Sequence, residues 1–192
     1  YGTGTRTHHN ISATGGSDRV RFFASIGYLN EDGNIDNYGY NRLNLRSNID
    51  AKLTKSLTFT LGVSGRIEKR DSPRYSANPD DWHNVPQQVI RALPYVPDTY
   101  EYEGKTYNVS TPTASSPVAP LASINESGYS KSNYSYIQSN FSLKYDAPWL
   151  KGLSFKFQGA YDLTYNFSKI LSNPYEVMIL SLIHISEPTR PY

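Results

Sequence analysis

Apolar and polar residues alternate along most of this chain, a pattern typical of β-strands with one apolar and one polar face. Between residues 42 and 53, five of the six odd positions are apolar, and all six even positions are polar or charged. Similar alternation occurs in the segments 9–14, 20–28, 57–68, 137–145 and 153–167. The pattern predicts six antiparallel strands. The chain contains no run of about 18 apolar residues, so it predicts no transmembrane helix.

The predicted connections alternate between short and long. Those at 15–19, 54–56 and 147–152 are tight turns, the one at 30–39 is a medium loop, and the one at about 71–132 is very long. Because every second connection of an up-and-down sheet lies at the same edge, the tight turns should share one edge and the long connections the other. In the longest one, residues 81–93 predict a short helix that starts late because of Pro86 and stops at Pro94.

Strand length and aromatic placement favour a membrane-spanning sheet. The predicted strands of roughly 9 to 15 residues exceed the 5 to 6 that are usual in soluble proteins. Aromatic residues stand near the predicted strand ends, as interfacial girdles require. They are Tyr28, Tyr40, Tyr134, Tyr136, Tyr165 and Phe167 at the long-loop ends, and Tyr145 and Trp149 by a tight turn. Alternation alone also fits a soluble antiparallel sandwich or barrel whose apolar face points inward.

The fold class that these observations predict is all-β. It is a partial transmembrane antiparallel β-barrel of about six up-and-down strands, with one long extracellular loop that contains a short helix. Six strands do not close such a barrel, since the smallest has about eight. The strands are therefore expected to belong to a larger sheet.

Composition removes several other classes of protein. The chain has 192 residues, of which 38% are hydrophobic and 14% aromatic, with 17 tyrosines and no cysteine. The net charge of +2 gives no basic stripe, so no nucleic-acid partner is expected. The missing cysteines exclude disulfides, thiolate zinc sites and cysteine nucleophiles.

No motif predicts catalysis, a cofactor or a metal. His8 and His9 are adjacent, so they point to opposite faces of a strand. Asp32, Asn34 and Asp36 resemble the start of a calcium loop, but the glycine and the glutamate that such a loop needs at its sixth and twelfth positions are missing. No G-x-S-x-G elbow is present. A β-rich glycosidase would need two facing carboxylates, which the sequence does not place.

Two groups of residues are candidates for ligand contact. Aromatic side chains of the long loop offer flat apolar surfaces with polar tips that suit stacking on sugar rings. They are Trp82, Tyr95, Tyr100, Tyr102 and Tyr107. Charged residues at the polar positions of the strands are expected to face the lumen or to contact a plug domain. They are Arg21, Arg42, Arg46, Asp50, Lys52 and Arg66.

Several of these stretches together resemble a known family. GGSDRVRFFASIGY at 15–28, NEDG at 30–33 and YNRLNLRSNID at 40–50 are similar to the SusC/RagA-type TonB-linked outer-membrane transporters. The segments at 128–130, 141–146 and 150–153 fit the same family, so the resemblance spans about residues 7–162.

The resemblance implies a barrel of about 22 strands in the outer membrane of a Gram-negative cell, in contact with its lipid. It implies that the chain begins just after the plug domain, so that TonB acts through an N-terminal region missing here. It further implies a SusD-like surface lipoprotein as partner, and import of oligosaccharides or other nutrients. Residues 1–179 are thus expected to form a partial barrel domain.

The last segment, 180–192, departs from the pattern. Its sequence LSLIHISEPTR at 180–190 resembles a translated sequencing-library adapter, and we expect it to be non-native. Two other functions stay open for the rest: a soluble extracellular carbohydrate-binding β-sandwich, and a passive outer-membrane porin without TonB energisation.

Overall fold

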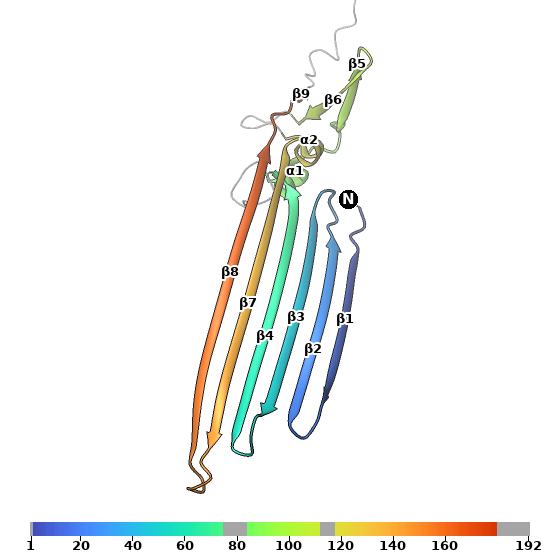
Figure 1. Ribbon diagram of the computed structural model, residues 1–192. Helices are drawn as coiled ribbons and strands as arrows, with labels where there is room; N and C mark the ends of the chain where they lie inside the picture. The colour runs from blue at the N-terminus through green and yellow to red at the C-terminus, as the bar shows by residue number, and fades with distance from the viewer. Residues whose placement is uncertain (1, 75–83, 112–117, 180–192) are drawn as a thin grey trace, which may run out of the picture. The chain divides into compact units, whose positions relative to one another are not determined.

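The strands form a six-stranded antiparallel sheet in which chain neighbours are spatial neighbours. The computed structural model describes residues 2–74, 84–111 and 118–179. The order across the sheet is β1-β2-β3-β4-β7-β8, which is the predicted up-and-down arrangement (Figure 1). The strands are β1 (Arg6–Gly16), β2 (Val20–Asp32), β3 (Gly39–Lys52), β4 (Leu57–Pro73), β7 (Gly128–Asp146) and β8 (Ser154–Ser172).

All six predicted strands are present, and each is longer than its apolar alternation. β7 and β8 have 19 residues each, and β1 extends beyond the predicted 9–14 at both ends. The backbone ladder needs only paired N–H and C=O groups, so it continues where the side chains on both faces are polar. The connection between β4 and β7 accordingly runs from 74 to 127, shorter than the predicted 71–132.

The chain groups into two compact units. Unit 1 comprises Tyr1–Arg70 and Ser132–Ser168 and holds most of the sheet, and unit 2 comprises Asp71–Lys131 and Lys169–Tyr192. No helix in the described part of the chain has the length and apolar character needed to cross a membrane.

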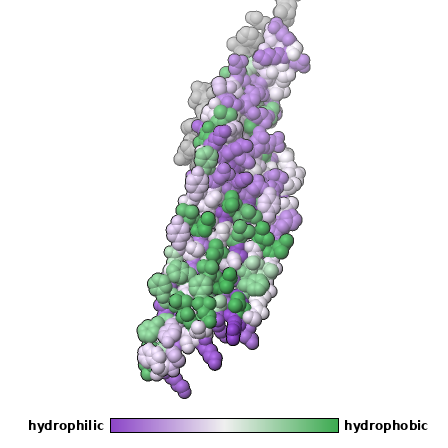
Figure 2. Space-filling model, viewed as in Figure 1, coloured by the Kyte–Doolittle hydropathy of each residue, from purple (hydrophilic) through white to green (hydrophobic). Residues whose placement is uncertain are grey.

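One face of the sheet in unit 1 is apolar across neighbouring strands. Ile26 of β2 lies opposite Ile11 of β1 and Leu45 of β3, and Phe22 lies opposite Ile49. Since successive side chains of a strand alternate between faces, this register puts the apolar positions of the three strands on one side. We call this side the apolar face and the other the polar face. Figure 2 shows a patch of apolar side chains gathered over part of the strands.

Protein does not cover the apolar face within unit 1. The buried hydrophobic residues in its described part are only Leu29 and Ala147. Phe141 and Phe155 expose 41% and 55% of their surface. A soluble sandwich buries such side chains against a second sheet. The sheet of unit 1 therefore has no protein core of its own, as expected of a barrel wall that faces lipid.

Unit 2 contains a small folded body built from the long connection and from the segment that follows β8. It contains α1 (Val85–Arg91), β5 (Thr99–Tyr102), β6 (Lys105–Ser110), α2 (Pro120–Asn125) and β9 (Met178–Ile179). The predicted late-starting helix is confirmed as α1, with Pro86 in its first turn, where a missing N–H is tolerated. The hairpin β5–β6, the helix α2 and β9 were not predicted.

The interior of unit 2 combines small apolar residues with a buried glutamine. Gln88 of α1 is 1% exposed, and its Oε1 accepts hydrogen bonds from the Ala119 amide at 3.2 Å and the Ser123 hydroxyl at 3.0 Å. Ser123 also lies 2.8 Å from the Tyr175 hydroxyl. These bonds join α1 to α2 and to the segment after β8, so the described parts of the long connection are folded against one another.

Candidate functional site on the polar face

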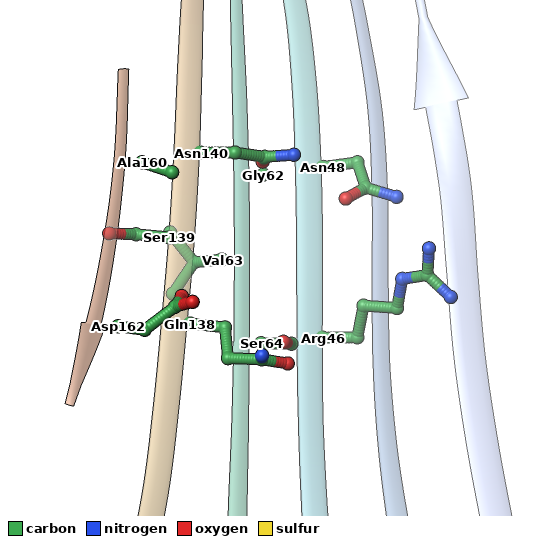
Figure 3. A pocket seen from close by; sticks show the side chains of 10 residues that line it. All are labelled: Arg46, Asn48, Gly62, Val63, Ser64, Gln138, Ser139, Asn140, Ala160 and Asp162. Atoms are coloured by element: carbon green, nitrogen blue, oxygen red, sulfur yellow. The ribbon is translucent and has the colours of Figure 1, made fainter. Parts of the chain in front are cut away.

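A shallow groove crosses the polar face over four strands. It has a volume of about 460 Å³, and Figure 3 shows its side chains in rows that run from strand to strand. Its lining residues are Arg46, Asn48, Gly62, Val63, Ser64, Gln138, Ser139, Asn140, Ala160 and Asp162. At Gly62 an added Cβ would collide with Oδ1 of Asn140, so the glycine leaves room for that amide. The groove thus presents amides, a hydroxyl and charged groups to solvent.

Further along the same face, a glutamate lies between two arginines of β4. Glu68 Oε1 is 3.1 Å from Nε of Arg66, and its Oε2 is 3.1 Å from Nη2 of Arg70. The Glu68 side chain is only 6% exposed, whereas those of Arg66 and Arg70 are 46% and 58% exposed. All three are even positions of one strand and share a face. The buried carboxylate therefore holds two guanidinium groups that remain accessible.

Tyrosine rings lie against both guanidinium groups. The Arg66 guanidinium is 4.4 Å from the ring centroid of Tyr136, and that of Arg70 is 5.1 Å from Tyr134 and 5.7 Å from Tyr40. Such cation–π contacts restrict the arginine side chains without using their N–H donors. The prediction that these three tyrosines form a lipid-side girdle is wrong, because they occupy the strand positions of the polar face.

A third arginine lies beside this group. A Cβ added at Gly65 of β4 would lie 3.9 Å from Cβ of Leu45 of β3, so these two residues lie opposite one another. In the same antiparallel register, Arg42 of β3 falls opposite Glu68 of β4. Arg42 Nε is buried and has no hydrogen-bond partner among the described residues. We call Arg42, Arg66, Glu68 and Arg70 the arginine cluster.

The other predicted lumen-facing residues also follow the polar face. Arg21 of β2 lies opposite Asp50 of β3, and both side chains are exposed. Arg46 lines the groove, and Lys52 lies at the end of β3, where its amide donates to the Arg19 carbonyl at 2.7 Å. The register thus pairs Arg21 with Asp50 and puts Arg42 on the strand beside Arg66, whereas Arg46 and Lys52 lie elsewhere along the sheet.

Two members of the arginine cluster, Glu68 and Arg70, and the tyrosine that contacts it, Tyr136, were not predicted as site residues. Glu68, Arg70 and Tyr136 share the strand parity of Arg66 or of the polar positions of β7, and that parity was the available signal. Glu68 is a polar position of the predicted strand 57–68, whereas Arg70 and Tyr136 lie just outside the predicted strands 57–68 and 137–145. The burial of Glu68 has no sequence signature.

Most of the predicted loop aromatics come together on the hairpin of unit 2. Tyr100 lies opposite Tyr107, and Tyr102 lies opposite Lys105, so all four side chains share one face. The Lys105 Nζ lies 4.9 Å from the Tyr107 ring centroid. We call this the tyrosine face. On the other side, Asn108 donates to Glu126 at 2.6 Å, which ties the hairpin to the end of α2.

The remaining two loop aromatics are apart from that face. Tyr95 lies between α1 and β5 and is 77% exposed. Trp82 falls outside the described residues. The described parts of the chain contain no group of three or more histidine, cysteine or acidic side chains able to hold a metal ion. The chemistry that the described side chains offer is reversible binding by hydrogen bonds, charge and stacking.

Part of this chain is similar in sequence to known proteins. No family model matches the chain. TonB-dependent receptor P39 of Formosa agariphila is 31% identical over 68 residues, which are 35% of this chain and 7% of the receptor. TonB-dependent receptor P3 of the same organism is 31% identical over 71 residues, which are 37% of this chain and 7% of the receptor.

Among solved structures, the RagAB peptide importer in its closed-closed state is similar to this fold. The TM-score is 0.58 with 22% identity, over 88% of this chain and 19% of the importer chain. The chain is SusC/RagA-like. The SusC/RagA-like chain spans only 7% of the curated receptors that it matches. TonB-dependent receptors are outer-membrane proteins, and the same localisation holds for this SusC/RagA-like sheet.

Proposed function

We propose that the protein carrying this sheet is an outer-membrane importer that takes up nutrient oligomers with energy from TonB. The supporting observation is the contrast between the two sheet faces. The apolar face is uncovered within unit 1, while the polar face carries a groove and the arginine cluster. A barrel wall between lipid and a polar lumen has this distribution.

The proposal assigns each unit a part in transport and no part in catalysis. The sheet of unit 1 forms part of the lumen wall, and its charged residues contact the ligand or a plug. Unit 2 is an extracellular loop whose tyrosine face contacts the ligand, because loops on a rigid scaffold carry most binding residues. A SusD-like lipoprotein is the expected partner at the cell surface. TonB is expected to act through an N-terminal plug region.

The ligand is expected to be an oligosaccharide or a similar nutrient. Tyr100 and Tyr102 expose flat rings with polar tips beside the half-buried Tyr107, which suits sugar rings and also peptide backbones. The RagAB importer is a peptide importer. Both oligomer classes therefore belong in the uptake test.

The test is uptake by cells that express the complete protein. Labelled oligosaccharides and peptides should enter only in cells with TonB and a proton-motive force, and an ionophore should stop entry. Uptake that persists without TonB would indicate a passive porin instead. Recovery of the protein in the soluble fraction without detergent would indicate a soluble carbohydrate-binding sandwich.

A further inference from the structure

The arginine cluster has more positive charge than its protein surroundings neutralise. It contains three guanidinium groups and one carboxylate, and Glu68 is the one acidic partner of Arg66 and Arg70 among the described residues. The carboxylate occupies Nε of one and Nη2 of the other. Since a guanidinium has five N–H donors, several donors on each stay available.

The cluster is also held in place before any ligand arrives. Glu68 forms an ion pair with each of the two arginines, and the rings of Tyr136 and Tyr134 on β7 pack against their guanidinium groups. Their half-exposed side chains therefore lose little freedom on binding a further anion. Solvent-screened surface arginines without such support bind anions weakly.

A third guanidinium on the same face adds to the positive charge of the cluster. Arg42 Nε is buried and has no partner among the described residues, although a buried N–H normally has one. Arg42 falls opposite Glu68 on the adjacent strand, on the face that carries Arg66 and Arg70. An acceptor bound beside Glu68 would therefore meet the accessible donors of Arg66 and Arg70, with the charge of Arg42 nearby.

We propose that the arginine cluster is a carboxylate-binding site and that the imported oligomer is acidic. This inference rests on the proposed function and narrows its ligand class. Carboxylates match the planar donor pairs of arginine, and neutral hydroxyls do not. The carboxylate can come from a uronic acid or from an acidic peptide side chain, and the experiment separates these sources.

The experiment measures binding to the purified complete protein in detergent. Four probes are compared: tetragalacturonate, its neutral methyl ester, a hexapeptide of alternating Glu and Gly with acetylated and amidated ends, and the same blocked peptide with Gln in place of Glu. Either the sugar acid or the acidic peptide should bind at least about tenfold more tightly than its neutral counterpart, as expected for hydrogen bonds to charged groups. The preferred acidic probe identifies the source of the carboxylate.

Variants then test whether the arginine cluster causes the preference for the acidic probe. The double change Arg66→Gln with Arg70→Gln should remove the preference for the acidic probe, so that the acidic and neutral probes bind with similar affinity. Arg66→Lys with Arg70→Lys should restore only part, since lysine lacks the fork geometry. The matched control is Lys55→Gln with Lys151→Gln, which removes the same charge from two tight turns.

The possible results separate this inference from the proposed function. Equal binding of acidic and neutral probes, absence of binding to all four, or a preference that survives in the arginine double variant overturns the carboxylate site. TonB-dependent uptake of a neutral oligomer in the same protein would leave the transport proposal standing. If cells that express the complete protein show no TonB-dependent uptake of any probe, the transport proposal is overturned, whatever the purified protein binds.

Discussion

The ring of Phe141 on β7 lies directly over Gly159 on β8. A Cβ added at Gly159 would meet ring carbons Cε1 and Cζ at 2.5 and 2.6 Å, which is closer than real contacts allow. The ring also lies beside Phe157, with centroids 5.8 Å apart. A ring that covers a cross-strand glycine shields backbone that would otherwise face lipid and fixes the pairing of the two strands.

We expect Phe141 and Gly159 to be energetically coupled. Gly159→Ala should destabilise the complete protein by about 1 to 3 kcal/mol, because the ring must move. In a Phe141→Ala background the same change should cost almost nothing. Urea unfolding of the four proteins in lipid gives the coupling energy. A coupling below about 0.5 kcal/mol would contradict the interpretation that the ring covers the glycine.

The two faces of β3 should respond oppositely to an added charge. Leu45→Arg puts a cation on the apolar face and should cost about 2 to 4 kcal/mol of stability in lipid. Its neighbour Asn44 has the other parity, so Asn44→Arg should cost less than about 1 kcal/mol. The measurement is the heat-modifiable folded fraction in purified outer membranes. Equal losses for both variants would show that lipid does not face Leu45.

The buried Glu68 should stabilise the sheet, because its negative charge offsets the repulsion between Arg66 and Arg70. Glu68→Gln keeps the shape but removes the charge, so Arg66 and Arg70 then repel one another, and we expect a loss of about 1 to 3 kcal/mol. Added salt should recover part of the loss, because it screens the repulsion. The control is Asp162→Asn, an exposed carboxylate of the same face. Thermal unfolding at low and high salt checks both changes, and a loss that salt does not reduce would count against charge repulsion.

Gln88 should control the integrity of unit 2. Gln88→Leu leaves the amide of Ala119 and the hydroxyl of Ser123 without their buried acceptor, at a cost of about 1 to 3 kcal/mol. Faster proteolysis between β4 and β7 in intact cells should follow. Ile90→Ser on the exposed side of α1 is the control and should leave the cleavage rate unchanged. Equal resistance of Gln88→Leu and the wild type would show that the buried bonds do not hold the unit together.

The strand alternation was sufficient to predict the sheet. Apolar residues at every second position define which side of each strand meets lipid, and this depends only on the period of the backbone. The tight turns and the late start of α1 at Pro86 are likewise local features. The six strands, their order and the apolar face were therefore predictable from the sequence.

Features that depend on distant partners were not predictable in this way. The hairpin of unit 2 turns at Glu103 and Gly104, both with positive φ, and Glu is not a residue that marks such turns. Tyr40, Tyr134 and Tyr136 were predicted to be membrane girdle residues because they lie near strand ends. A position near a strand end does not tell which face of the sheet an aromatic side chain occupies. Only the pairing of β3, β4 and β7 put their rings against Arg66 and Arg70.

By itself, then, the sequence determined the six long strands, the helix α1, the two faces and the SusC/RagA resemblance, since each follows from a repeat or a motif within a short stretch. The tertiary structure alone decided which charged residues act together. Glu68 becomes buried, and Arg42 comes to lie beside Arg66 and Arg70, through the register of strands that are far apart in the chain. Register is set by the fit of whole strands to one another, so no single segment contains it.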